Sequence, residues 1–297
     1  MKTVTVNGYA KLNLFLDVVG AKNGYHLLDT VVATVDVNDK LALSSRNDGK
    51  IALNCSRGLF VSRLSEDNNA YKAAKLFRET FNTPGVTVTL KKNIPVGSGM
   101  GGSSADIAAV LRGMAELYDV SDDLKPLADS LGSDSGYLLT GGFARLKGRG
   151  ELVESLDCDV KLYAVVVTAD GGVNTTECFR RFDGFTDSGT DKMADDLISA
   201  LKRGDYTSDM FYNALTFAAC SINPEIGKVL DDVKSLSPRA VSMSGSGSSV
   251  FGIFDTPELV LWASSKLKKK YKNVFSVQTL SREELKKQQS SRSLFSI

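Results

Sequence analysis

The alternation of polar and apolar residues predicts β-strands in the first part of the chain. It runs from Thr3 to Leu16 and again from Val31 to Leu43, with the two-residue period of a strand that buries one face. The polar stretch from Gly20 to Tyr25 is predicted to be the turn between them. Further on, apolar residues recur at helical spacing from Asn69 to Phe81, and alternation returns from Val86 to Lys91.

The second half of the chain contains shorter segments of both kinds. The apolar run from Lys161 to Thr168 has the pattern of a buried strand. A helix is predicted from Pro224 to Leu236, because Asn223 is placed to cap it and proline occupies its first position. Two strands, a helix and a last strand complete the pattern: Ala240–Met243, Val250–Phe254, Pro257–Tyr271 and Val274–Thr279. From about residue 283 the chain is rich in Lys, Gln and Ser, and we expect a frayed tail.

The order of these elements indicates the fold class. Strands and helices follow one another without regular strand–helix alternation, which favours an α+β fold over a doubly wound sheet. The chain has 297 residues, more than the roughly 100 to 150 of one compact core, so we expect two domains or one large one. The buried strand from Lys161 is placed to open the second domain, which gives domains of residues 1–158 and 159–297.

Composition and charge exclude several classes of protein. Hydrophobic residues make up 42% of the chain and charged residues 24%, which excludes collagen-like, coiled-coil and wholly disordered chains. The 36 basic and 35 acidic residues leave a formal charge of +1, so there is no electrostatic reason to expect nucleic acid as a partner. A site for a small anion remains compatible with this balance.

The N-terminal segment and the cysteines bear on the compartment. The first residues alternate polar and apolar side chains and lack the apolar core of a secretory signal, and no later run reaches the roughly 18 apolar residues of a membrane helix. The four cysteines are widely spaced, without a CxxC pair: Cys55, Cys158, Cys178 and Cys220. We therefore expect a cytoplasmic protein with reduced thiols and no membrane partner.

A glycine-rich loop between Asn93 and Asp106 carries the clearest chemical signal. Four glycines leave room for backbone N–H groups to close around an anion: Gly97, Gly99, Gly101 and Gly102. A helix predicted to begin near Ser104 adds its free donors and the positive end of its dipole. The loop therefore predicts a phosphate site, with a flexible turn as the alternative.

The loop differs from the common nucleotide motifs. Its glycine spacing fits the dinucleotide fingerprint, but Pro95 interrupts the approach and Glu116, at about the expected distance for the acidic residue, lies inside the helix. The sequence contains no GxxxxGK[ST], which excludes a P-loop, and no HRD or DFG follows, which excludes a protein kinase.

Three motifs together resemble those of the GHMP small-molecule kinases. They are the loop from Pro95 to Ala105, the stretch Ala10–Leu14 and the stretch Ser244–Ser248, in the order expected for the family. The resemblance implies an N-terminal domain like ribosomal protein S5 domain 2, a ferredoxin-like C-terminal domain and an active site in the cleft between them. It also implies ATP as the phosphoryl donor, with Mg²⁺.

One branch of the family is matched more closely. The carrying residues are Ala10–Leu16, Gly24–His26, Asp67–Asn68, Lys92–Val96, Gly132–Asp134 and Gly148–Glu151. That branch acts in the non-mevalonate isoprenoid route and phosphorylates the 2-hydroxyl of the methylerythritol unit of a cytidine diphosphate conjugate. The resemblance therefore implies this conjugate as the substrate.

The resemblance assigns the catalytic roles to Lys11 and Asp134. Lys11 and Asn13 lie two apart on a predicted strand and so share one face, although a lysine on a strand is most often a solvated residue. Asp134 is implied as the carboxylate that accepts the proton of the substrate hydroxyl, although by itself it is equally compatible with a turn aspartate. Asn13 is implied as a substrate contact.

The pyrimidine site is implied at Tyr25 and His26. A tyrosine ring can stack on a pyrimidine while an imidazole bonds its polar edge, whereas a lone histidine is more often structural. The resemblance adds Phe179 as a second aromatic wall, and plain core packing of Phe179 is an equal alternative. Gly245 and Gly247 of the third motif are implied at the substrate as well.

The nucleotide contacts follow the phosphate loop. The resemblance implies Asn68 and Lys92 beside the nucleotide, Pro95 and the loop glycines around the phosphates, and Ser103 or Ser104 as the hydroxyl that reaches Mg²⁺. Each of these polar residues is also compatible with an ordinary loop position.

Departures from the family pattern leave other activities open. Ser135 and Gly136 follow Asp134 where proline is usual, and residues 102–106 read Gly-Ser-Ser-Ala-Asp where Gly-Gly-Ser-Ser-Asp is usual. Asn213–Ala214 stands where an Asn-Asp pair is common. The alternatives are a GHMP kinase of the homoserine or mevalonate type and a catalytically silent nucleotide-binding relative. A Rossmann oxidoreductase is the last alternative.

Overall fold

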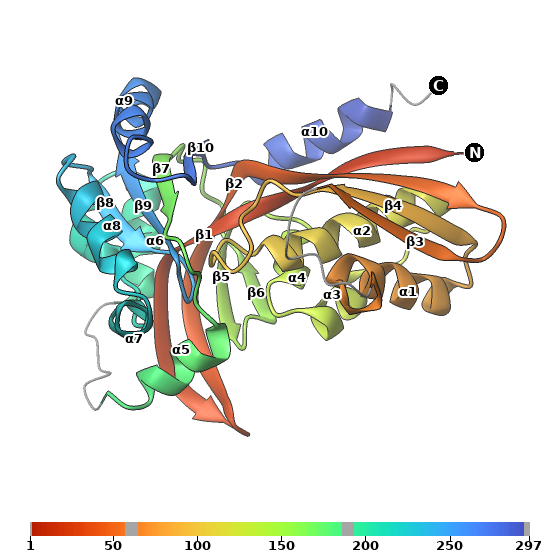
Figure 1. Ribbon diagram of the computed structural model, residues 1–297, viewed down its shortest axis with the longest axis horizontal. Helices are drawn as coiled ribbons and strands as arrows, with labels where there is room; N and C mark the ends of the chain where they lie inside the picture. The colour runs from red at the N-terminus through yellow and green to blue at the C-terminus, as the bar shows by residue number, and fades with distance from the viewer. Residues whose placement is uncertain (1, 57–64, 186–192, 294–297) are drawn as a thin grey trace.

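The computed structural model describes residues 2–56, 65–185 and 193–293, with side chains described as far as residue 288. Two sheets lie side by side, one built from the N-terminal half of the chain and one from the C-terminal half (Figure 1). Helices pack against both sheets. This mixture of separate sheets and helices confirms the α+β fold class.

The first sheet contains six strands in the order β3-β4-β2-β5-β6, with β1 paired to β2. Their bounds are β1 Thr3–Lys22, β2 Tyr25–Arg46, β3 Ile51–Ser56, β4 Gly85–Lys91, β5 Phe143–Gly148 and β6 Leu152–Ser155. β2 pairs with β1 on one edge and with β4 and then β5 on the other. β1 is therefore an edge strand of this sheet.

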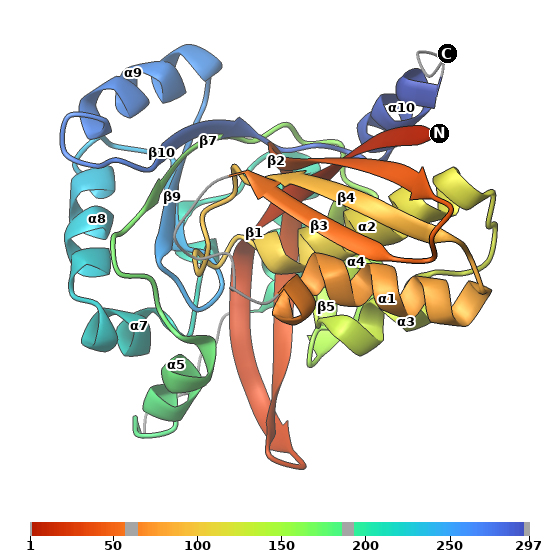
Figure 2. The same cartoon turned by 45° about the vertical axis from the view of Figure 1, so that its right-hand side comes forward.

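β1 and β2 are longer than the alternation predicts. Both continue into the stretch that was predicted as a turn, and only Asn23 and Gly24 separate them. These two residues have φ of 52° and 78°, the left-handed conformations that a tight Asn-Gly hairpin turn requires. The turn predicted from Gly20 to Tyr25 is therefore too long at both ends, because the strands occupy all of it except Asn23 and Gly24. The closed end of the hairpin projects away from the rest of the sheet (Figures 1 and 2).

Four helices accompany the first sheet: α1 Asn69–Phe81, α2 Gly102–Tyr118, α3 Lys125–Leu131 and α4 Ser135–Leu138. α1 has the predicted bounds, while α2 begins at Gly102, two residues before the position predicted. The core between these helices and the sheet includes Phe77, Leu43 and Leu111, which have no exposed surface. Such burial is worth about 1.5 to 3 kcal/mol for each large side chain.

The second sheet is antiparallel, with the order β10-β7-β9-β8. Its strands are β7 Tyr163–Thr168, β8 Ala240–Met243, β9 Ser249–Phe254 and β10 Val274–Gln278. The helices of this half are α5 Thr175–Phe182, α6 Ala194–Arg203, α7 Thr216–Ile222, α8 Glu225–Lys234 and α9 Pro257–Leu267. Short 3₁₀ turns occupy Ser65–Asp67 in the first half and Ser208–Met210 in the second. α8 begins one residue after the predicted start, so Pro224 rather than Asn223 is its N-cap, although Asn223 Oδ1 accepts the N–H of Glu225 at 3.2 Å.

One hydrophobic core joins the two halves. Phe15 and Val32 of the first sheet share a buried cluster with Val166 and Phe251 of the second. The two sheets are thereby held together by packing. The domain boundary at residue 158 falls between β6 and β7 and stays a prediction.

The prediction of a frayed C-terminal tail is wrong. Residues Arg282–Ser293 form helix α10, which lies along the N-terminal part of β1 (Figure 1). The Glu284 N–H donates to Ser281 Oγ at 3.2 Å, and the Ser281 N–H donates to Glu284 Oε2 at 2.8 Å, which together form a capping box. Leu285 is buried against Tyr9. This signal was present in the sequence, but the polar composition of the tail concealed it. Residues 294–297 of the predicted tail lie outside the described residues.

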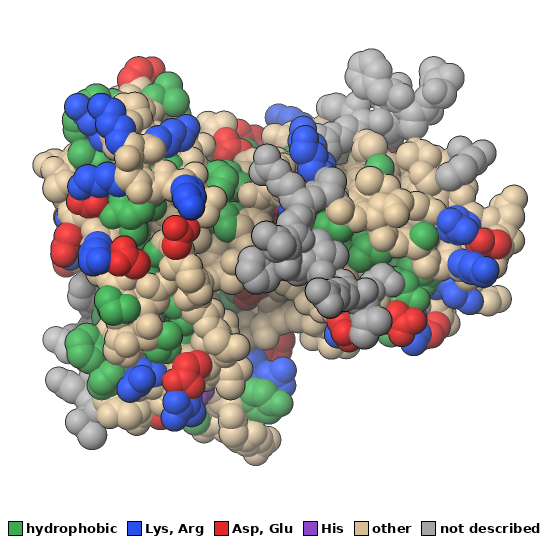
Figure 3. All heavy atoms as spheres, viewed as in Figure 1, with side chains coloured by type: hydrophobic (Ala, Val, Ile, Leu, Met, Phe, Trp, Pro, Cys, Tyr) green, Lys and Arg blue, Asp and Glu red, His purple; other side chains and the backbone are tan. Residues whose placement is uncertain are grey.

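The surface carries charges of both signs. Figure 3 shows basic and acidic side chains interspersed over the face seen in Figure 1. In the described part of the chain, no helix is both long and apolar enough to span a membrane.

Candidate active site

A cleft of about 1090 Å³ lies between the two halves. Its walls include β1, β2, the glycine-rich loop and the Asp134 turn from the first half, and residues 168–175 and 245–248 from the second. Ligand pockets usually measure about 300 to 1,000 Å³, so this cleft has room for a nucleotide and a second small molecule together.

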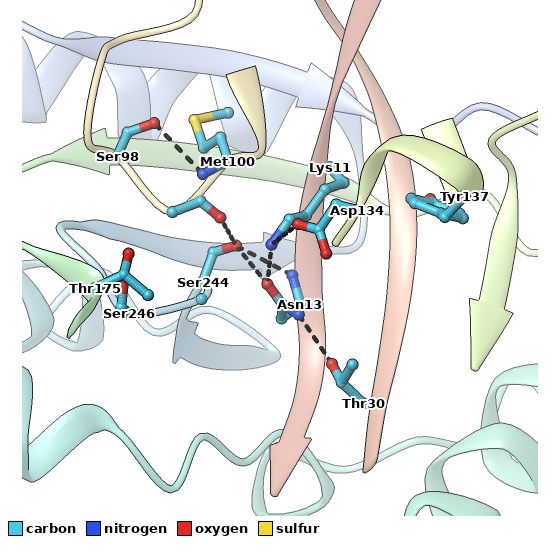
Figure 4. Close-up of polar contacts among 12 residues, drawn as sticks. Lys11, Asn13, Thr30, Ser98, Met100, Asp134, Tyr137, Thr175, Ser244 and Ser246 are labelled. Atoms are coloured by element: carbon cyan, nitrogen blue, oxygen red, sulfur yellow. Dashed lines mark hydrogen bonds and ion pairs between the residues drawn. The ribbon is translucent and has the colours of Figure 1, made fainter. Parts of the chain in front are cut away.

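β1 presents two polar side chains to the cleft. Lys11 and Asn13 share one face of the strand, as their spacing predicts, and are 4% and 3% exposed. The Lys11 ammonium donates a hydrogen bond to Asn13 Oδ1 (Figure 4). Asn13 Nδ2 donates to Thr30 Oγ1 of β2 at 2.9 Å, which fixes the orientation of the amide. The lysine is therefore a buried and oriented cation rather than a solvated one.

Asp134 lies opposite Lys11. It occupies the N-cap position of α4, and its Oδ2 is 3.4 Å from Lys11 Nζ. Its side chain is 28% exposed and points towards the lysine (Figure 4). The two residues predicted as a catalytic pair, which are 123 positions apart, are thus brought together with one carboxylate oxygen beside the ammonium.

The glycine-rich loop adopts the conformations that its composition predicts. Gly97, Gly99 and Gly101 have φ of 66°, 75° and 73°, which L side chains rarely adopt. A Cβ on Gly99 would lie 2.1 Å from Ser244 O, and one on Gly101 would lie 3.1 Å from Lys11 Cγ. Gly101 is also the N-cap of α2 and supplies no capping side chain, so the first N–H groups of the helix remain available to an anion.

The second glycine- and serine-rich loop braces the first. Ser244 Oγ accepts the N–H of Asn13 at 3.1 Å and donates to Gly99 O at 3.0 Å. Gly245 and Gly247 line the cleft with φ of 58° and 86°. This loop therefore joins the glycine-rich loop and β1.

Lys92 lies in a cluster with two carboxylates. Its ammonium contacts Asp39 Oδ2 and Asp106 Oδ2, the latter at 2.6 Å. Asp39 Oδ1 also accepts the N–H of Ile94 at 2.9 Å, so it anchors the start of the phosphate loop. Burial raises the pKa of Asp106 more than the Lys92 ammonium lowers it. For Lys92, burial lowers the pKa, but the two carboxylates outweigh this and the net pKa is raised.

The residues predicted for the nucleotide and metal lie along one side of the cleft. Asn68 caps α1 by accepting the N–H of Ala70 at 2.8 Å, and the neighbouring Asn69 donates to Ser103 Oγ. A Cβ on Gly132 would lie 3.2 Å from Ser104 Oγ, so Ser104 borders the Asp134 turn. These hydroxyls and the Asp134 carboxylate are hard oxygen donors, and Mg²⁺ usually binds to one or two such protein groups together with substrate phosphates. The donor set fits magnesium.

The residues predicted for the pyrimidine make two sets of contacts. His26 and Phe179 stack directly on each other, with ring centroids 4.7 Å apart, and Asp183 Oδ1 lies 2.7 Å from His26 Nε2. Tyr25 is 54% exposed, and the Arg149 guanidinium lies 4.2 Å from the centre of its ring. Phe179 and Arg149 line the cleft. Among the described residues, Tyr25 and His26 do not line the cleft themselves, but each contacts a residue that does. Because His26 covers one face of Phe179, that ring can offer only its other face to a ligand.

Several site residues were not predicted from the sequence. Arg149 belongs to a motif that was noticed, but nothing local indicates that its side chain reaches Tyr25. Asp39 and Asp183 are single acidic residues that meet Lys92 and His26 only in the folded chain. Asn213, recognised only as a departure, donates to Met243 O and Gly245 O at 2.8 Å and supports the second glycine loop.

Comparison with known proteins agrees with this geometry. A family model described as the GHMP kinases N terminal domain matches residues 68–143, and one described as GHMP kinases C terminal matches residues 197–273. The 4-diphosphocytidyl-2-C-methyl-D-erythritol kinase of Clostridium beijerinckii is 33% identical over 282 residues, which cover 93% of this chain and 99% of that protein. The kinase of the same name from Bacillus cereus strain B4264 is 34% identical over 257 residues, 84% of this chain and 87% of that protein.

Solved structures show the same relationship. A crystal structure of 4-(cytidine 5'-diphospho)-2C-methyl-D-erythritol kinase matches with a TM-score of 0.80 and 31% identity, covering 93% of this chain and 98% of that one. The mevalonate kinase of L. major matches with a TM-score of 0.72 at 15% identity, covering 93% and 96% of the two chains, which shows the fold alone. The chain belongs to the GHMP kinase family. It is therefore an ATP-dependent small-molecule kinase.

Proposed function

We propose that this kinase phosphorylates the 2-hydroxyl of 4-diphosphocytidyl-2-C-methyl-D-erythritol, a step of non-mevalonate isoprenoid synthesis. The supporting observation is two contacting pairs, His26 with Phe179 and Tyr25 with Arg149, of which Phe179 and Arg149 line the cleft. Aromatic faces and an imidazole suit a pyrimidine, and a guanidinium suits a diphosphate. The relatives that are about one third identical over most of the chain carry the name of this activity.

The proposed transfer uses the Lys11–Asp134 pair. Asp134 accepts the proton of the substrate 2-hydroxyl, and the oxygen of that hydroxyl forms a bond to the γ-phosphorus of ATP. The bond from this phosphorus to the β–γ bridging oxygen breaks, which releases ADP. Lys11, 3.4 Å from Asp134, offsets negative charge as the oxygen attacks. Asn13 holds the ammonium in place through its Oδ1.

The phosphate loop and the hydroxyls beside it hold the triphosphate in this proposal. Backbone N–H groups from Gly97 to Ser104 surround the phosphates, with the N-terminus of α2 behind them. Ser103 and Ser104 are the candidate ligands for magnesium, and Ser104 is favoured because it borders the Asp134 turn. Magnesium, when bound, offsets the charge of the phosphates.

The pyrimidine is expected to be read by His26 and Tyr25. When the Nε2 of His26 donates to Asp183, its Nδ1 remains an acceptor, which suits the exocyclic amine of cytosine. Tyr25 offers a ring face. Phe179, which stacks on His26, lines the cleft.

The test is ADP release from ATP and Mg²⁺ across a panel of acceptors: the cytidine conjugate, homoserine and mevalonate. The proposal expects turnover with the conjugate alone, and His26→Ala should raise the KM for the conjugate about tenfold to a hundredfold, the cost of an unpaired polar edge. The KM for ATP should stay within about twofold of wild type. Turnover with homoserine or mevalonate in place of the conjugate would reject the proposed substrate and leave the kinase family intact.

A further inference from the structure

Arg112 is an arginine of helix α2 whose charge meets carbonyl groups instead of a carboxylate. Its Nη1 donates to Leu138 O at 2.7 Å and to Leu139 O at 3.2 Å, and its Nη2 donates to Asn7 O at 2.7 Å. In the part of the chain that the structure describes, no acidic side chain is paired with it. Burial lowers the pKa of its guanidinium to about 10, so the group is still charged at neutral pH.

The three elements that meet at Arg112 each carry one part of the candidate site. Arg112 itself lies on α2, which begins at the phosphate loop. Asn7 lies on β1, four residues before Lys11. Leu138 and Leu139 close the C-terminal end of α4, whose N-cap is Asp134. One guanidinium therefore connects α2, which begins at the phosphate loop, with β1, which carries Lys11, and α4, whose N-cap is Asp134.

We infer that Arg112 is a positioning residue that holds Asp134 against Lys11 by way of α4. The path is short: Arg112 holds the carbonyl of Leu138, and the N–H of the same residue donates to Asp134 O at 3.0 Å. The backbone of Asp134 is thus linked by one hydrogen bond to a residue that Arg112 anchors. This inference rests on the proposed role of Asp134 but not on the identity of the acceptor.

α4 depends on this anchor more than the other two elements do. α2 has 17 residues and ten buried side chains or glycines, and β1 is paired with β2 along its length. α4 has only four residues, too few for a helix to be stable by itself. All four of its residues are buried, and Tyr137 is a further tie, because its hydroxyl bonds Thr34 Oγ1 and Gly142 O at 2.8 and 2.7 Å. Tyr137 points away from Lys11, whereas Asp134 points towards it (Figure 4).

The test compares Arg112→Met, which keeps the length of the side chain and removes every donor, with Arg112→Lys, which keeps a charge and a donor. Arg112→Met should lower kcat about tenfold to a hundredfold, the effect of a displacement of about 1 Å at a reacting group. The KM for ATP should change less than about twofold, because α2 and its loop are held by other contacts. Arg112→Lys should recover most of the loss, because an ammonium can bond at least one of the carbonyls.

A double-mutant cycle separates positioning from general destabilisation. In the Asp134→Asn background, adding Arg112→Met should lower kcat by less than about a further threefold, because both changes act on the same group. Arg145→Lys is the matched control: this arginine is ion-paired to Asp29 at 2.6 Å, away from α4, and its replacement should lower stability without changing kcat per folded molecule.

All rates are normalised to folded protein by titration of ATP-binding sites, with whichever acceptor of the panel the wild type uses. A wild-type enzyme that rejects the cytidine conjugate would overturn the proposed substrate alone. Equal kcat losses from Arg112→Met in the wild-type and Asp134→Asn backgrounds would overturn the positioning role. An unchanged kcat in folded Arg112→Met would overturn it as well.

Discussion

The chemistry proposed at the residue scale depends on how Lys11 and Asp134 are held. Lys11 is 4% exposed and bonded to Asn13, so its ammonium has little freedom to move. Asp134 is 28% exposed, which leaves it open to a substrate hydroxyl from the cleft. A fixed cation beside an accessible carboxylate is the arrangement that proton transfer to a base during phosphoryl transfer requires.

Asp134→Asn should lower kcat by about 10²- to 10⁴-fold, the usual effect of losing a positioned proton acceptor. The amide has the same shape but cannot take the proton, so ATP binding should be preserved. Single-turnover kinetics and an ATP titration of the same preparation measure the two effects. Turnover close to wild type in a folded Asp134→Asn protein would leave Lys11 and the loops as the main catalytic groups.

At the scale of elements, the two glycine loops act as one unit. Ser244 bonds both Gly99 and Asn13, and the Ser249 N–H donates to Ser98 O at 3.0 Å. The phosphate loop is therefore supported by the second half of the chain as well as by α2. Its shape depends on contacts that lie about 145 positions apart in the sequence.

Gly99→Ala should raise the KM for ATP about tenfold or more, because the new Cβ would lie 2.1 Å from a backbone oxygen and the loop must shift. Gly97→Ala is the matched control. Its φ of 66° is similar, but a Cβ there meets nothing within 4 Å, so it carries only the conformational cost of about 1 to 2 kcal/mol. Initial-rate measurements at varied ATP compare the two. Equal effects would mean that the contact with Ser244 does not shape the loop.

Helix α10 is the other element whose role can be tested. Leu285→Ala should lower the free energy of unfolding by about 2 to 4 kcal/mol, because this side chain is 3% exposed against β1. Glu283→Ala on the exposed face of the same helix should change it by less than about 0.5 kcal/mol. Urea unfolding followed by circular dichroism measures both. Similar small effects would show that α10 contributes little to the stability of the fold.

On the scale of the whole molecule, the proposed function needs two binding regions within one cleft. The phosphate loop, Lys92, Phe179 and Arg149 all line a single cleft of about 1090 Å³. The core that links the two sheets holds these regions at a set separation. The two ligands of the proposed reaction are thus expected to bind together.

Cytidine diphosphate should inhibit competitively against the cytidine conjugate and noncompetitively against ATP, because it would occupy only the aromatic end of the cleft. Steady-state inhibition with each substrate varied in turn measures the pattern. Adenosine diphosphate is the control and should show the opposite pattern. Competition of cytidine diphosphate with ATP would place both at the phosphate loop and contradict two separate regions.

The sequence by itself determined the features that depend on local chemistry. Glycines at 97, 99 and 101 are required by left-handed backbone conformations, and the period-two pattern of β1 places Lys11 and Asn13 on one face. The family follows from three such motifs in order. Each of these features can be read within a few residues, because backbone conformation and side-chain direction are set locally.

Tertiary structure alone decided the contacts between distant groups. Asp39 and Asp106 meet Lys92, Asp183 meets His26, and Phe179 stacks on the imidazole. No local pattern marks any of these, because an isolated acidic residue looks the same whether it is solvated or paired. α10 forms because Leu285 finds an apolar partner on β1, and Arg112 gains its role because three elements bring carbonyls to it. Such contacts depend on chain segments that only folding brings together, so their energies cannot be read from local sequence.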